Sequence, residues 1–311
     1  MQSPTKPLVS VIIPHLNQPG DLESCLRSLE AQSLQRSMFE IIVVDNGSVS
    51  PPDAVVAPHP AVRLLCEPRP GPGLARNRGV DAAVGAILCF IDADCRADRD
   101  WLCHVVETFL SVPAGTILGG DVRIWRDDVT RFTALEAYET VFAYRFKLYI
   151  EQHGFCGTGN LAVRRADFER IGPFGGVELA EDIDWGRRAC AAGFVFRYVP
   201  GMIVFHPARR SIGELLVKWD RHIQHALNMV QEKPWWRMYW LTRALGVLLS
   251  PILDVGKVLT SERIDGMATR FEASIVLIVV RAYRAWRMLA LLWARKGILW
   301  NRESAVGMDE A

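Results

Sequence analysis

The chain has 311 residues, half of them hydrophobic, with 36 basic and 35 acidic side chains and a formal net charge of +1. This length allows one large domain or two smaller ones, and the balanced charge gives no overall field that would attract nucleic acid. Its 7 cysteines include no CxxC pair, which argues against a disulfide framework or a structural zinc site and favours reduced thiols.

The first two thirds of the chain alternate between strand-like and helix-like segments. Helical spacing of apolar residues predicts helices at 21–32 and 73–84. Short apolar runs predict strands at 8–13, 39–44, 61–66 and 86–91. Because this alternation is typical of a parallel sheet covered by helices on both faces, the predicted fold class is α/β, with a doubly wound, mostly parallel sheet.

After Trp101 the alternation is less regular. A strand is expected at 116–124, an aromatic-rich helix at 133–149, and a helix at 182–192. The glycine-rich turn GFCGTGN leads into a short strand at 161–163, and two strands separated by Pro200-Gly201 are expected within 194–206. From Ser211 onward the sequence is typical of helix.

Polar residues follow the predicted parallel strands at the points where the strands end. They are His15 and Asn17, Asp45 and Asn46, and Asp92 and Asp94. In doubly wound sheets, ligands bind beyond the carboxyl ends of the strands. The sequence therefore predicts a binding site at this edge of the sheet.

Asp92 and Asp94 are separated by one small residue, Ala93, directly after a buried strand. Residues i and i+2 of an extended chain point the same way, so both carboxylates could reach one cation. Such hard oxygen ligands suit Mg²⁺ or Mn²⁺. The alternative is a solvated turn or an N-cap of the following helix.

Six motifs in a fixed order closely resemble glycosyltransferases of family 2, over about residues 8–206. They are VSVIIPHLN (9–17), IIVVDNGS (41–48), GPGLARNRG (71–79), ILCFIDAD (87–94), GTGNLAVRR (157–165) and EDIDW (181–185). The resemblance implies the GT-A fold and an inverting, metal-dependent transfer from a nucleotide-diphosphate sugar, most often a UDP-sugar, to an acceptor hydroxyl. It also implies a role in making cell-envelope polysaccharide, exopolysaccharide or glycolipid.

The resemblance also implies roles for individual residues. Asp94 would contact the metal directly, and Asp92 would either bind the metal or reach the ribose. Asp182 would be the catalytic base. The predicted contacts to the donor nucleotide are Pro14, Asn17, Asp45, Arg76, Asn77 and Asp92, and those to the acceptor are Gly159, Asn160, Glu181 and Trp185.

Three of these assignments remain open on the sequence alone. Glu181, Asp182 and Asp184 are all candidates for the base, and one of them could instead only stabilise the positive end of the helix dipole. Trp185 is either a core residue or a stacking platform for a sugar. His206 follows a strand and is either a further metal ligand or a structural histidine.

Other function classes fit less well. A dinucleotide fingerprint would need glycine where Arg76 stands, and its glycines should follow the first strand. The sequence has no P-loop motif. A catalytically silent GT-A domain that serves as a binding or scaffold subunit remains the alternative to an enzyme, although the three aspartates of the motifs are intact.

The predicted domains are a catalytic domain at 1–210, with a nucleotide-sugar half at about 1–100 and an acceptor half at about 101–210, and a helical extension at 211–311. Trp235, Trp236 and Trp240 begin an aromatic region, and Arg281, Arg284, Arg287 and Arg295-Lys296 follow apolar runs. This pattern suits an amphipathic surface at a lipid interface, with a hairpin packed on protein as the alternative. We therefore expect peripheral membrane contact, a glycan or lipid-linked acceptor, and a cytoplasmic location at the inner face of the membrane. The first ten residues predict no signal peptide.

Overall fold

The computed structural model describes residues 6–177 and 180–292, and the chain divides into two compact units. The first comprises Met1–Arg123 and Arg145–Pro207, and the second comprises Ile124–Tyr144 and Ala208–Ala311. The predicted domain boundary is at residue 210, with 124–144 in the acceptor half. In the structure this segment belongs to the second unit, because its helix packs there.

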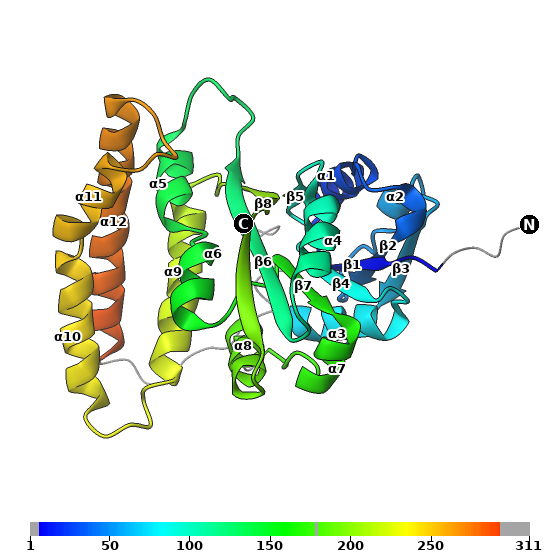
Figure 1. Cartoon of the computed structure of the whole chain (residues 1–311). Helices are drawn as coiled ribbons and strands as arrows, with labels where there is room; N and C mark the ends of the chain where they lie inside the picture. The colour runs from blue at the N-terminus through cyan, green and yellow to red at the C-terminus, as the bar shows by residue number, and fades with distance from the viewer. Residues whose placement is uncertain (1–5, 178–179, 293–311) are drawn as a thin grey trace, which may run out of the picture. The chain divides into compact units, whose positions relative to one another are not determined.

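A single mixed sheet forms the centre of the first unit. Its strand order is β3-β2-β1-β4-β7-β6-β8-β5 (Figure 1). In the described residues the strands are β1 (Val9–His15), β2 (Phe39–Asp45), β3 (Val62–Cys66), β4 (Ile87–Ile91), β5 (Arg96–Ala97), β6 (Thr116–Trp125), β7 (Asn160–Arg164) and β8 (Val195–Pro207).

The two halves of this sheet differ in strand direction. β1 pairs in parallel with β2 and with β4, and β2 pairs in parallel with β3. β7 is antiparallel to both β4 and β6, and β5 is antiparallel to β8. The α/β class is confirmed. The parallel pairing lies among the first four strands, whose carboxyl ends share one edge.

Helices cover both faces of the parallel strands, as expected. Val11, Ile13 and Cys89 face α1 (Pro19–Glu30) and α4 (Trp101–Ser111) in one buried core. On the other face, a Cβ at Gly79 in α3 (Pro72–Ala82) would lie 2.5 Å from the Ile12 side chain. Glycine therefore allows α3 to pack close to the sheet. In the described part of the first unit, the other α-helices are α2 (Asp53–Val56), α6 (Phe146–Leu148), α7 (Arg165–Ile171) and α8 (Glu181–Ala191).

Two predicted elements were wrong. The two strands expected within 194–206 form one strand, β8, which runs through Pro200 and Gly201. Proline is tolerated where its missing N–H faces a sheet edge, and β5 pairs only with Val204 and Phe205 of β8. Gly201 packs so close to the His104 ring that a Cβ would lie 2.8 Å from it. Here proline and glycine mark close packing and not a turn.

The helix predicted at 133–149 is also interrupted. α5 (Ala134–Phe142) begins with a capping box formed by Thr133 and Glu136. The chain then leaves the helix, and α6 and a π-helical turn at Tyr149–His153 follow in the first unit. No glycine or proline lies within 133–149, so nothing in the sequence marks this break.

The second unit consists of helices, as predicted from Ser211 onward. In the described residues they are α5, α9 (Ile212–Asn228), α10 (Trp236–Leu249), α11 (Pro251–Leu259) and α12 (Met267–Leu291), and α10 lies alongside α12 (Figure 1). Trp240 anchors this packing, since it is fully buried and its indole N–H donates to the Met288 carbonyl (2.9 Å). In the described part of the chain, no helix combines the length and the apolar composition that a membrane span requires. Arg295-Lys296 lies outside the described residues.

Candidate active site

The carboxyl end of β4 delivers Asp92 to a buried arginine. Arg76 of α3 is 3% exposed, and its Nη2 lies 2.5 Å from Asp92 Oδ1. Its Nη1 donates to Glu181 Oε1 (3.1 Å) at the start of α8. One guanidinium therefore bridges the predicted donor side and the predicted acceptor side, which are far apart in sequence. Burial raises the pKa of Asp92, although the charge of Arg76 partly opposes this effect.

The loop before β7 is shaped to admit Asp92. A Cβ at Gly159 would lie 2.6 Å from Asp92 Oδ2. Any larger residue at position 159 would therefore displace either the loop or the carboxylate. Gly159 acts here by leaving space beside the β4 carboxylate.

The first turn of α8 contains three acidic residues in different surroundings. Asp184 pairs with Arg188 one turn later (2.9 Å), an ordinary i,i+4 ion pair. Glu181 is held by Arg76. Asp182 is partly buried, and the ion pairs of the described residues do not include it. Burial and then the charge of Glu181 raise the pKa of Asp182 to about 6.

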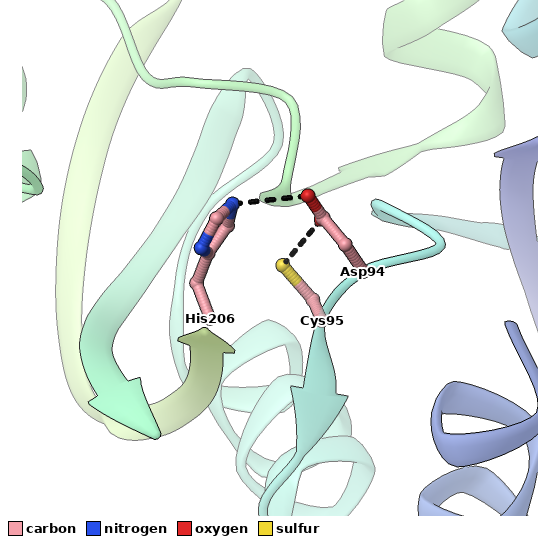
Figure 2. A group of neighbouring side chains, drawn as sticks. All are labelled: Asp94, Cys95 and His206. Atoms are coloured by element: carbon pink, nitrogen blue, oxygen red, sulfur yellow. Dashed lines mark hydrogen bonds and ion pairs between the residues drawn. The ribbon is translucent and has the colours of Figure 1, made fainter. Parts of the chain in front are cut away.

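Asp94 faces a histidine at the far end of the sheet. Its Oδ2 lies 3.1 Å from Nε2 of His206 in β8, and its Oδ1 accepts a weak bond from the Cys95 thiol (3.6 Å). Figure 2 shows the three side chains converging, and one ligand atom from each lies within 4.8 Å of the others. Strand pairing explains the arrangement, because β5 follows Cys95 directly and its Arg96 pairs with Phe205 beside His206.

The hydrogen bonds of His206 fit a cation site. Its Nδ1 lies 2.6 Å from the Pro207 carbonyl, which can only accept, so Nδ1 carries a proton. In the neutral ring, Nε2 then has a lone pair directed at the Asp94 carboxylate. Two electron-rich atoms at this separation need a positive charge between them, either a proton or a metal ion. A histidine that binds a metal through one nitrogen typically donates its other N–H to such a partner.

Cys95 contributes differently to this group. Burial, and then the charges of Asp94 and Asp92, raise the pKa of its thiol well above the ordinary value. The sulfur is therefore protonated and soft, whereas Mg²⁺ and Mn²⁺ prefer oxygen and nitrogen. The donors that fit a hard divalent ion here are the carboxylate of Asp94 and the imidazole of His206.

A second constellation lies at the carboxyl ends of β1 and β2, where His15 and Asp45 are register partners. His15 Nδ1 lies 3.1 Å from Asp45 Oδ1, and Asp45 also accepts bonds from the hydroxyl and the N–H of Ser48. Burial acts to raise the pKa of Asp45, but the hydrogen bonds from Ser48 and His15 outweigh it and hold this pKa below its usual range. Asn17, with a positive φ of 55°, accepts from Val49 N–H and fixes the neighbouring loop. Pro14 lies in β1 directly before His15.

Comparison with known proteins decides the family. The sequence pattern of Glycosyl transferase family 2 matches residues 10–172. Glycosyltransferase AglE of Haloferax volcanii is 34% identical over 223 residues, which cover 70% of this chain and 72% of AglE. The chain belongs to glycosyltransferase family 2. A PGL/p-HBAD biosynthesis glycosyltransferase of Mycobacterium tuberculosis is 38% identical over 122 residues, 37% of this chain and 47% of the relative.

Solved structures show that this glycosyltransferase has the GT-A fold. A mannosyltransferase from Pyrobaculum calidifontis, PcManGT, solved with GDP-Man and Mn²⁺, superposes with a TM-score of 0.59. The match covers 94% of this chain and 90% of that one at 20% identity. TarS of S. aureus gives a TM-score of 0.50 over 88% of this chain and 54% of that one, at 16% identity.

Three residues of the predicted glycosyltransferase site have packing or hydrogen-bonding roles within the fold, and two of them are buried. Asn160 is fully buried, and its amide donates to the carbonyls of Asp121 and Met202 and accepts from the Trp101 indole. Trp185 is 1% exposed within an aromatic cluster, so its interpretation as a core residue agrees with the structure and the sugar-platform alternative does not. Asn77 exchanges two hydrogen bonds with the Phe174 backbone.

His15 and Cys95 belong to the two side-chain groups described above but are not among the site residues predicted from the sequence. His15 was noted only as a polar residue at a strand end, and the pairing of β1 with β2 makes it the partner of Asp45. Cys95 follows the D-x-D motif directly, which was the available signal. The burial that keeps Cys95 neutral comes from tertiary packing.

Proposed function

We propose that this glycosyltransferase moves a sugar from a nucleotide-diphosphate sugar to an acceptor hydroxyl with inversion, and that Asp182 is the base. The observation that carries the proposal is the partly buried Asp182 carboxylate, with a pKa of about 6, in the same turn as the Arg76-bound Glu181. A general base works best with a pKa near the working pH. One base without a covalent intermediate gives a single displacement and therefore inversion.

The other carboxylates take separate roles in this proposal. Asp94 and His206 would hold Mg²⁺ or Mn²⁺, while Asp92, held by Arg76, faces the donor beside Gly159. When bound, the ion would act as a Lewis acid on the diphosphate oxygens and stabilise the negative charge of the leaving group. GalNAc-T7, solved with UDP, GalNAc and Mn²⁺, superposes with a TM-score of 0.50 over 67% of this chain and 45% of that one at 16% identity. The Mn²⁺ in the structures of PcManGT and of GalNAc-T7 supports a divalent ion at a GT-A site.

The nucleoside would lie at the ends of β1 and β2. Asp45 is fixed there by His15 and Ser48 and stays ionised, so it can accept hydrogen bonds from a base or a ribose. Pro14 and Asn17 shape the adjoining loop. We propose a UDP-sugar as donor. PcManGT was solved with GDP-Man and GalNAc-T7 with UDP, so the test covers both nucleotides.

A panel of UDP-, GDP- and dTDP-sugars, measured by thermal shift with Mn²⁺, tests this proposal. A ligand at 100-fold its Kd should stabilise the native state by about 2.7 kcal/mol. We expect one nucleotide-sugar to raise the melting temperature and to be hydrolysed slowly. If every donor lacks both binding and hydrolysis, the chain is a catalytically silent scaffold subunit instead.

Burial and the charge of Glu181 raise the pKa of Asp182 to about 6. The rate of sugar transfer should therefore fall as the pH drops below this value. Only the ionised carboxylate can accept the proton of the acceptor, so the rate should fall about tenfold per pH unit below that value. Single-turnover rates with saturating donor and metal at each pH measure this dependence. Asp184→Asn should leave the profile unchanged, and a flat profile between roughly pH 5 and 7 would contradict the assignment.

We further propose that the second unit contacts the membrane, which would place the enzyme beside a lipid-linked or cell-envelope acceptor at the inner face. The outer sides of α10 and α11 expose large apolar side chains, with Leu249 at 60%, Ile252 at 77% and Leu253 at 80%. Exposed apolar patches of this kind are typical of interaction surfaces. Exposed Lys233 before α10, and exposed Arg237 and Arg243 within it, would favour anionic headgroups.

Flotation with vesicles that contain phosphatidylglycerol tests the membrane contact. Changing Leu249, Ile252 and Leu253 together to serine should weaken vesicle binding at least tenfold, because burying each leucine or isoleucine in lipid contributes about 1.5–3 kcal/mol. The matched control is Leu110→Ser, which removes a side chain 84% exposed in the first unit. If the triple variant floats as well as the wild type, this surface does not bind lipid.

A further inference from the structure

A basic cluster lies in the second unit, where the start of α9 meets α5. Glu139 of α5 is 1% exposed and accepts from the backbone N–H of Arg209 (2.8 Å) and from its guanidinium (2.9 Å). The same guanidinium donates to the Tyr144 hydroxyl (3.0 Å). Lys218 Nζ lies 4.0 Å from Glu139 and 5.4 Å from the centre of the Tyr144 ring. Arg209 and Lys218 therefore share one carboxylate.

Arg221 adds a third cation on the same helix, three residues after Lys218. The cluster of Glu139, Tyr144, Arg209, Lys218 and Arg221 thus has more cationic than anionic side chains. The pKa values of these side chains agree with an excess of positive charge in the cluster. Burial, and then the charge of Arg209, lower the pKa of Lys218 to about 8. Burial and Arg209 also lower the pKa of Arg221. Neighbouring positive charges make each further proton less favourable.

The other carboxylate on this stretch of α9 is engaged elsewhere. Asp220 accepts from Arg287 (2.9 Å) and from the Tyr283 hydroxyl (2.8 Å), both on α12. The cluster is nevertheless open on one side, because the side chains of Arg209 and Lys218 are 20% and 16% exposed and Arg221 is exposed. An anion could therefore reach the three cations without unfolding the helices.

We propose that Arg209, Lys218 and Arg221 form a binding site for a phosphate-bearing anion in the second unit. The arginine fork matches a phosphate in geometry, and the lysine adds a compact charge beside it. Glu139 and Tyr144 fix the Arg209 guanidinium, so this donor is already oriented. More than one cation suits a dianionic phosphate better than a single carboxylate. The phosphate belongs either to a free phosphate or diphosphate compound or to a lipid headgroup.

Calorimetric titration of the full chain with inorganic pyrophosphate, in the presence of EDTA, tests the site. Removing two charged donors with Lys218→Gln and Arg221→Gln together should weaken binding about tenfold or more. Arg263→Gln, which removes an exposed cation from the loop between α11 and α12, should not change pyrophosphate binding. If pyrophosphate also binds to the first unit without a metal, this binding is the same in the wild type and in both variants, so it does not affect the comparison. Because neither sugar nucleotide nor metal is present, the result is independent of the proposed transfer reaction.

Vesicles of phosphatidylcholine, with and without phosphatidic acid, identify the source of the phosphate. If the double variant loses binding to the phosphatidic acid vesicles, the site takes a lipid phosphate. If it loses only pyrophosphate binding, the site takes a free phosphate compound. The proposal is overturned if wild type and double variant bind both probes equally, or if the wild type binds neither.

A measurement on the wild-type chain avoids any effect of the substitutions on folding. Lys218, with its lowered pKa, should react with acetic anhydride at neutral pH, and pyrophosphate or phosphatidic acid vesicles should protect it. Lys147, which is exposed in α6 of the first unit, serves as the internal control. With either probe present, mass spectrometry of the two peptides should show labelling of Lys218 alone slowed at least about threefold. This is the protection expected when most of the sites are occupied. Equal labelling with and without both probes would contradict the site.

Discussion

Replacing Asp182 by asparagine should lower the rate of sugar transfer by about 10²–10⁴-fold, the usual contribution of a positioned general base. The amide keeps the size of the carboxylate but cannot take the acceptor proton. Donor binding should change little, because the proposed cation and nucleotide sites use Asp94, His206 and Asp45 and not Asp182. Single-turnover transfer and donor Kd, measured on the same preparation, separate these two effects.

Two neighbouring carboxylates serve as matched controls for this experiment. Asp184→Asn breaks an ion pair with Arg188 on the same helix and should leave transfer within about threefold of wild type, since partly exposed pairs contribute at most about 1 kcal/mol. Glu181→Gln removes a partner of Arg76 and should act mainly on acceptor KM. Wild-type transfer by Asp182→Asn would show that the base is elsewhere, and loss of activity in Asp184→Asn alone would identify it.

Replacing Asp94 by asparagine, or His206 by alanine, should weaken Mn²⁺ binding by at least about tenfold, since even partners of metal ligands typically cost 10–100-fold. The reason is that each of these side chains supplies one atom of the only His/Cys/Asp/Glu group of metal-binding geometry in the described residues. Electron paramagnetic resonance of free Mn²⁺, titrated with protein and donor, measures the affinity directly. Transfer should fall in parallel.

The control for these variants is Asp81→Asn, which removes an exposed carboxylate from α3 of the same unit. It should bind Mn²⁺ like the wild type. Cys95→Ser provides a second comparison, because a protonated thiol contributes little to a hard cation, so its effect should be smaller than that of Asp94→Asn. If Asp94→Asn binds Mn²⁺ with unchanged affinity while another carboxylate variant does not, the cation lies elsewhere.

The parallel half of the fold could be predicted because its strands are continuous apolar runs ended by polar residues. Ile41–Val44 and Ile87–Ile91 are such runs, and β2 and β4 begin and end within about two residues of the predicted limits. Because these strands are parallel, the polar side chains that come after them lie at the same edge of the sheet, which could also be predicted. In contrast, the antiparallel half depends on tertiary packing that leaves weak local signals, such as the close contact of Gly201 with His104.

The candidate site was predictable as a set of residues but not as a set of contacts. The D-x-D motif and the acidic turn at 181–185 are visible in the sequence. Their connection through Arg76 joins residues 105 positions apart, and the structure alone provides it. The different surroundings of Asp182 and Asp184 likewise come from tertiary packing, because both lie in one turn with similar local sequence.

The single guanidinium of Arg76 between Asp92 and Glu181 has an energetic consequence. Because both carboxylates draw on one cation, neutralising either of them strengthens the hold of Arg76 on the other. Substitutions at the two positions should therefore be non-additive, as is usual for residues of one hydrogen-bonded network. Under the proposed roles, in which Asp92 lies at the donor and Glu181 at the acceptor, binding of the first substrate would change the affinity for the second.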